Sequence, residues 1–143
     1  MEYKEVKDSG EREEFPTGSV RDTREGKGRY DLLPTYAISR LAKHFENGAK
    51  KYGDRNWEKG QNLSRYLDSA LRHIFKYLGG SRDEDHLAAS AWNVMAFIET
   101  QERIEAGVLP PELNDMPDNV RKTKSALELP SREKLQDWTM RSW

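Results

Sequence analysis

The chain has 143 residues, with 24 basic and 25 acidic side chains and a formal net charge of −1. This balance gives no general reason to expect binding to a nucleic acid polymer or to an anionic membrane. Cysteine is absent, which excludes disulfides and thiol catalysis. No apolar stretch reaches the roughly 20 residues that span a bilayer, so we expect a cytoplasmic protein, in the host cell's cytoplasm if it is viral.

Hydrophobic residues make up 35% of the chain, against about 45–50% in typical domains, and they are gathered in its central part. Residues 1–28 are rich in charge and glycine and show no helical or strand periodicity, so we expect a mobile tail. The alternative is an arm that orders over a neighbouring subunit or a bound ligand. The predicted organisation is a tail over 1–28, a helical domain over 29–107 and an extension over 108–143.

The first predicted helix begins at Pro34, which suits a first helical turn because it lacks an N–H group. Apolar residues recur at three- and four-residue spacing from Leu33 to Tyr52, which is the pattern of an amphipathic helix. Gly53 marks the end of this helix.

A second helix is predicted from Asn62 or Ser64 to Leu78, where two glycines stop it. The third, over 83–106, is apolar almost all round, which places it at the centre of a bundle.

The pattern predicts a capping box of Ser81 and Glu84 for the third helix. Two weaker helical candidates follow in the extension, near Val120–Leu129 and Ser131–Arg141. No segment alternates as a strand would, so the sequence predicts an all-α protein, an antiparallel helical bundle.

Three polar residues share one stripe of the third helix, because His86, Asn93 and Thr100 are seven residues apart. Burying such groups without partners costs about 1–3 kcal/mol each. They must therefore meet partners, either in a hydrogen-bond network between helices or in a site.

Acids and a histidine lie on the facing helices: Glu46 on the first, and Asp68 and His73 on the second, beside Arg72. Short connections make the helices antiparallel neighbours, so these side chains can converge on one cavity. Carboxylates with few imidazoles suit Mg²⁺ or Mn²⁺ better than zinc. Asp68 and His73 point about 140° apart on an ideal helix, so one of them would have a different role.

Basic and amide side chains surround the loop after the first helix. They are Lys50, Lys51, Arg55, Asn56 and Lys59, with Trp57 among them. Beside a metal site, such groups suit a polyphosphate, and an exposed tryptophan can stack on a base. The alternative is a helix C-terminus that merely favours cations.

Four segments together resemble one enzyme family. They are DLLP (31–34), ENGAKKYGDRNWEKG (46–60), YLDSALRH (66–73) and HLAASAWN (86–93). The resemblance is to phage dATP/dGTP diphosphohydrolases, within the all-α MazG-like nucleoside triphosphate pyrophosphohydrolases, and covers roughly residues 27–105.

The resemblance implies a homodimer or homotetramer that hydrolyses dGTP, and also dATP, to the monophosphate and pyrophosphate. Two or three Mg²⁺ or Mn²⁺ ions would be bound in each active site. In the phage pathway that it implies, dGMP feeds the synthesis of a 2-aminoadenine nucleotide while dATP is depleted. The helical domain over 29–107 would be the catalytic domain.

The chain departs from the superfamily at its metal ligands. Members use a Glu-x-x-Glu pair on one helix and a Glu-x-x-Asp pair on the next, and neither pair is intact here. One alignment places Asn93 at the final Asp and His73 near the last Glu of the preceding helix. Another starts the acidic pair at Glu46 and brings in Asp68, and both alignments stay open.

The pattern and the resemblance together give a predicted site. Its catalytic residues are Glu46, Asp68 and His73. Its metal ligands are drawn from Glu46, Asp68, His73, Asp85, His86 and Asn93. Its substrate-binding residues are Arg29, Lys50, Lys51, Arg55, Asn56, Trp57 and Arg72. The alternative function is a non-catalytic helical interaction module or a nucleotide-binding sensor.

Overall fold

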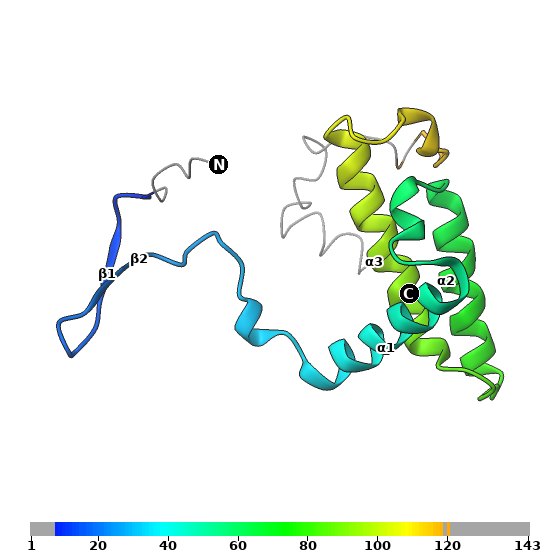
Figure 1. Cartoon of the computed structure of the whole chain (residues 1–143), viewed down its shortest axis with the longest axis horizontal. Coiled ribbons are helices and arrows are strands. Elements are labelled where there is room, and N and C mark those ends of the chain that lie inside the picture. The colour runs from blue at the N-terminus through cyan, green and yellow to red at the C-terminus, as the bar shows by residue number, and fades with distance from the viewer. Residues whose placement is uncertain (1–7, 119, 121–143) are drawn as a thin grey trace, which may run out of the picture. The chain divides into compact units, whose positions relative to one another are not determined.

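The computed structural model describes residues 8–118 and 120. The chain divides into two compact units, with the boundary between residues 35 and 36. The first unit holds a short β-hairpin, and the second holds three α-helices (Figure 1). No helix in the described part of the chain is long and apolar enough to cross a membrane. The helical candidates predicted over 120–129 and 131–141 fall outside the described residues, apart from residue 120.

The first unit contains two antiparallel strands, β1 (Arg12–Glu14) and β2 (Val20–Asp22), with Glu13 paired to Arg21. The expectation that the chain holds no β-sheet is therefore wrong for this segment. Strands of three residues are too short for an alternating pattern to be recognised in the sequence.

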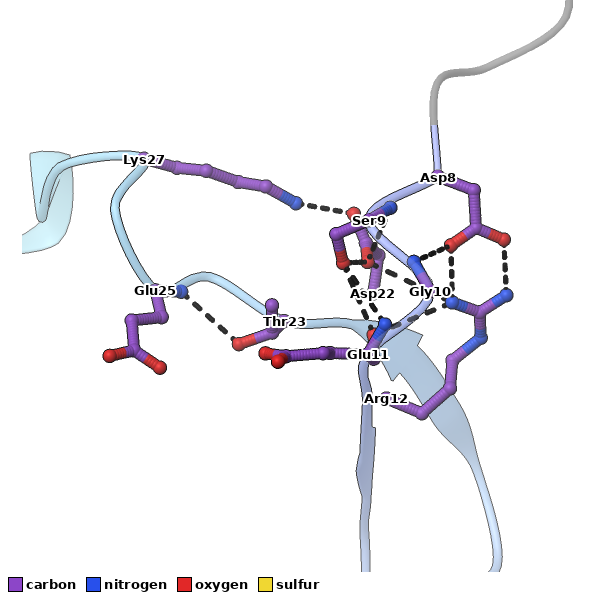
Figure 2. Close-up of polar contacts among 9 residues, drawn as sticks. All are labelled: Asp8, Ser9, Gly10, Glu11, Arg12, Asp22, Thr23, Glu25 and Lys27. Atoms are coloured by element: carbon purple, nitrogen blue, oxygen red, sulfur yellow. Dashed lines mark hydrogen bonds and ion pairs between the residues drawn. The ribbon is translucent and has the colours of Figure 1, made fainter.

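Polar side chains join the two strands where the hairpin opens (Figure 2). One Asp22 oxygen accepts from the Lys27 ammonium at 2.5 Å, and the other accepts from the Ser9 hydroxyl. The Lys27 bond is the main reason that the pKa of Asp22 is lowered to about 2. A further ion pair joins Asp8 and Arg12. Exposed polar contacts thus hold this hairpin, which is a second reason why no apolar pattern predicted it.

The second unit is built from α1 (Thr35–Tyr52), α2 (Leu63–Leu78) and α3 (His86–Glu105). Two short 3-10 helices accompany them, η2 (Asn56–Lys59) and η3 (Pro111–Leu113). A third, η1 (Tyr30–Leu32), belongs to the first unit. The helices α2 and α3 run antiparallel, side by side (Figure 1), and form the main contact of this unit. The predicted all-α class is confirmed, because the small hairpin is the only sheet among the described residues.

The helix α3 begins later than predicted. Asp85 is its N-cap, and one carboxylate oxygen accepts from the Ala88 N–H at 3.1 Å. The predicted capping box of Ser81 and Glu84 is therefore wrong. The Asp85 carboxylate is also held in its capping position by α1, because its two oxygens accept from the Arg40 guanidinium at 2.6 and 2.7 Å. This contact ties the start of α3 to α1.

The core lies between α2 and α3. Its central buried members are Leu63, Tyr66 and Ala96. The polar stripe of His86, Asn93 and Thr100 is buried as predicted, and it has partners. The Thr100 hydroxyl, for example, lies 3.5 Å from the Tyr66 hydroxyl.

The opposite side of α3 is uncovered by the described residues of this chain. Leu87, Val94, Met95 and Ile98 are 40–54% exposed there. The predicted position of α3 at the centre of a bundle is therefore wrong for the described part of a single chain, in which one side of the helix is packed. A long apolar helix marks a central element only when something covers both of its sides.

Candidate functional site

A cavity of about 850 Å³ opens among α1, η2, α2 and α3. Small-molecule sites typically measure about 300–1,000 Å³, so a ligand the size of a nucleotide fits this one. Its aromatic lining residues are Phe45, Tyr52, Trp57, Tyr66 and Trp92. Its lining also includes charged and polar side chains from each of the three helices, which gives the cavity an apolar part and a polar part.

All three histidines of the chain lie at this cavity or directly beside it. His44 comes from α1, His73 from α2 and His86 from the first position of α3. The Nδ1 atoms of His73 and His86 are 3.0 Å apart, and each lies 3.3 Å from Oε1 of Glu84. Atoms of these three residues lie within 4.8 Å of one another and form a group that can hold a metal ion.

A second carboxylate orients the buried His86 ring. Its Nε2 lies 2.8 Å from Oδ1 of Asp83 and 3.0 Å from the Ser81 hydroxyl. When Nε2–H donates to Asp83, the neutral ring has a lone pair on Nδ1, the atom that faces His73 and Glu84. Metal-bound histidines commonly donate their other ring N–H to a carboxylate in this way. Two imidazoles and one carboxylate therefore fit a divalent cation, and this nitrogen-rich ligand set suits a transition metal better than Mg²⁺. The expectation of carboxylates with few imidazoles does not hold for this group.

Burial keeps the imidazoles of His73, in the candidate metal group, and of His44, elsewhere in the cavity lining, neutral. It lowers the pKa of His73 and of His44 below the ordinary value of 6.5, while the nearby Glu84 carboxylate opposes the shift at both. At neutral pH both rings therefore offer a lone pair, which is the form of histidine that binds a metal.

The predicted acidic residues Glu46 and Asp68 line the cavity but are paired with cations. Glu46 accepts from the Lys43 ammonium at 2.7 Å and lies 3.0 Å from that of Lys50. These contacts, the Lys43 bond first, lower the pKa of Glu46 to about 2. Asp68 forms an ion pair with Arg72, one turn further along α2. Neither acid belongs to the histidine group in this structure.

Two other predicted ligands also have partners. Asp85 caps α3 and faces a separate cavity of about 190 Å³. Asn93 lines the main cavity, and its Nδ2 donates to the Ala89 carbonyl at 2.8 Å. Of the six predicted ligands, the structure brings together His73 and His86.

Four of the predicted substrate-binding residues line the cavity: Arg55, Asn56, Trp57 and Arg72. The cavity lining does not include Lys50, Lys51 or Arg29. Arg29 belongs to the first unit, where it forms a two-bond ion pair with Asp31.

Trp57 is partly buried, so the prediction of an exposed ring is wrong. Its ring meets Phe45 and Trp92 edge-on, with centroids 6.3 and 6.4 Å apart. Trp57 therefore builds the wall of the cavity. The more exposed aromatic residue of the lining is Tyr52.

Sequence reasoning missed Glu84 and His44. Glu84 was assigned to the first turn of a helix, but α3 begins at His86, so Glu84 lies in the preceding turn and reaches back to His73. The available signal was the position of Glu84 between two histidines on adjacent helices. For His44 the signal was its place on the apolar face of α1, one residue before Phe45.

The fold and the site define a small all-α protein with a candidate metal centre beside a nucleotide-sized cavity. Residues 17–107 match the family of dATP/dGTP diphosphohydrolases, in its N-terminal part. This range is well over half of the chain and includes the whole cavity lining, and the chain belongs to this family. The family's description indicates a hydrolase with a nucleoside triphosphate substrate. No curated protein and no solved structure matches the chain.

Proposed function

We propose that the protein hydrolyses purine deoxynucleoside triphosphates, dGTP and also dATP, to the monophosphate and pyrophosphate. The observation that carries this proposal is the cavity itself. Its aromatic lining suits a base, while His73 belongs both to its lining and to the candidate metal group. The cavity thus offers groups suited to the base of a nucleotide and to its phosphates, the two parts that its sugar joins.

The residues that would hold a divalent cation, Mn²⁺ or Mg²⁺, are His73, Glu84 and His86. Bound there, the cation would neutralise charge on the phosphates and lower the pKa of a water molecule. Asp83 holds the His86 ring in orientation through Nε2. Two or three ions would be bound in each site, with Asp85 and Asn93 as further candidate ligands.

Glu46 and Asp68 would complete the ligand set when substrate is present. Each is paired with an exposed lysine or arginine, and exposed ion pairs exchange partners at little cost. A triphosphate would draw Lys50 and Arg72 to its own oxygens, because charged phosphate oxygens are strong acceptors. The two carboxylates would then be available to a second ion or to the attacking water.

The remaining substrate contacts follow from the cavity lining. Arg55 would bind phosphate, while Asn56 and Trp57 would contact the sugar and the base. Lys51 and Arg29 are further candidate substrate-binding residues.

We further propose a homodimer or homotetramer. The exposed apolar residues of α3 support it, because large apolar side chains on one side of a helix are usually covered in the native assembly. A role in the phage 2-aminoadenine pathway, in the host cytoplasm, completes the proposal and rests on the family resemblance.

The direct test is to incubate the purified protein with dGTP or dATP and either Mn²⁺ or Mg²⁺, and to separate the products by chromatography. We expect the monophosphate and pyrophosphate. Formation of the diphosphate and orthophosphate would contradict the proposal. Binding without any product would indicate a nucleotide-binding sensor.

A further inference from the structure

One glycine lies on the part of α1 that faces the cavity. Gly48 is well inside this helix, has no left-handed backbone conformation, and lines the cavity. Glycine inside a helix is less favourable than alanine, because it loses more conformational freedom on folding. The helix itself therefore gives no reason for a glycine at this position.

Packing within the described chain gives no reason either. A Cβ placed on Gly48 would meet no heavy atom of the described residues within 4 Å outside its own turn of the helix. Gly60 is a useful contrast, because a Cβ there would come within 2.7 Å of a Leu113 methyl group. Gly60 is required by its neighbours, whereas Gly48 borders the open volume of the cavity.

Aromatic side chains lie on both sides of Gly48 along the helix. Phe45 precedes it by three residues and Tyr52 follows it by four, and residues at these spacings share a helix face. Both line the cavity, as does Trp57, whose ring centroid is 6.3 Å from that of Phe45. The missing side chain thus leaves open volume at a cavity wall that also carries aromatic rings, and a flat heterocycle can pack against such a wall.

We propose that Gly48 is a base-binding position, where the purine base of the substrate packs against the bare helix backbone. This proposal rests on the proposed function, because it names the part of that substrate that contacts this wall. The phosphates lie toward His73 and do not contact Gly48. A methyl group at position 48 would occupy the space that the ring needs.

The test is Gly48→Ala, with Ser39→Ala as the matched control on an exposed part of the same helix. Both changes favour helix formation, so we expect both to raise the Tm, by about 4 °C for Gly48→Ala and less for the control. A methyl group in a fitted pocket changes discrimination by about 10–200-fold. We therefore expect the KM for dGTP and dATP to rise at least about 10-fold in Gly48→Ala and to stay unchanged in Ser39→Ala.

Binding of inorganic tripolyphosphate, measured by calorimetry with Mn²⁺, separates the base from the phosphates. We expect both variants to bind it as the wild type does. Equal weakening of tripolyphosphate and dGTP binding in Gly48→Ala would overturn the proposal, because the phosphates would then contact this wall. An unchanged KM in a folded Gly48→Ala would overturn it as well.

A changed elution volume of Gly48→Ala in size-exclusion chromatography would also overturn the proposal, because it would assign the glycine to a subunit contact. Failure of the proposed function is a separate result, seen as absence of turnover by the wild type. The binding of dGMP to the wild type and to Gly48→Ala then decides the packing question: about 10-fold weaker binding supports it, and equal binding overturns it.

Discussion

The carboxylates around the cavity fall into two regions that differ in their partners. On α1 and α2, Glu46 and Asp68 are paired with lysine and arginine. In the turn before α3, Glu84 faces the imidazoles of His73 and His86. A carboxylate between cations is already neutralised, whereas one beside two imidazoles can complete a ligand set. The difference teaches that the side chains around a carboxylate, more than its place in a motif, indicate which carboxylate is available to a metal ion before substrate binds.

The largest expected effect follows from removing the charge of Glu84. Glu84→Gln should lower Mn²⁺-dependent turnover at least about 100-fold and remove the Mn²⁺-induced rise in Tm, because a metal ligand is lost. Glu99→Gln is the control, because its side chain is 47% exposed, as that of Glu84 is. An undiminished Mn²⁺ shift in Glu84→Gln would place the ion elsewhere.

Glu46→Gln tests the other region. We expect turnover to fall about 10-fold or more. The Mn²⁺-induced Tm shift without substrate should be retained, because Glu46 would join the site only when a triphosphate draws Lys50 away from it. Differential scanning fluorimetry with and without Mn²⁺ measures the shift, and circular dichroism checks helicity. Loss of the shift in this variant would mean that the two regions do not differ as described.

Asp83→Asn changes a residue that contacts a proposed metal ligand, His86, and would not bind the ion itself. Removing a carboxylate that orients a ligating histidine typically costs about 10–100-fold in metal affinity or activity. We expect a rise in the Mn²⁺ concentration needed for half-maximal activity, with recovery at saturating Mn²⁺. If excess Mn²⁺ fails to restore activity, Asp83 acts on something other than the His86 ring.

The smallest effect concerns a cation-paired carboxylate in the first unit. The pKa of Asp22 is lowered to about 2 from 3.8, mainly by Lys27. Because the pKa of Asp22 is lower in the hairpin than in the unfolded chain, its ionised carboxylate stabilises the hairpin at pH values above the unfolded-state pKa. This contribution disappears as the pH falls from about 4 to 2. Amide NMR signals of β1 and β2 should report this loss, and Asp22→Asn should show it at pH 7. Helix signals that change first on acidification would point to a different titrating group.

Much of the helical unit could be predicted from the sequence, because its determinants are local. Two glycines after Leu78 fixed the end of α2, and Gly53 with φ of +89° follows α1. The start of α3 was predicted too early, because Ser81 and Asp85 are both residue types that cap helices. A contact that also holds Asp85 comes from Arg40, 45 residues earlier. The hairpin was missed because its contacts are polar and exposed.

The site was predictable where buried polar residues had to find partners. His73 and His86 were predicted among the polar residues that face the core, and in the structure their Nδ1 atoms lie 3.0 Å apart. Glu84 could not be assigned because its role depends on where α3 begins. The open volume beside Gly48 has no signature in the sequence at all, because an unfilled space is a property of folded neighbours.

The turn between α2 and α3 has a consequence for how an ion would bind. His73 and His86 are 13 residues apart, and the packing of α2 against α3 already brings them together. The entropy of closing this loop is therefore lost on folding and not on metal binding. We expect a chelator to abolish turnover while leaving the far-ultraviolet spectrum unchanged, in contrast to zinc fingers, which unfold without their metal.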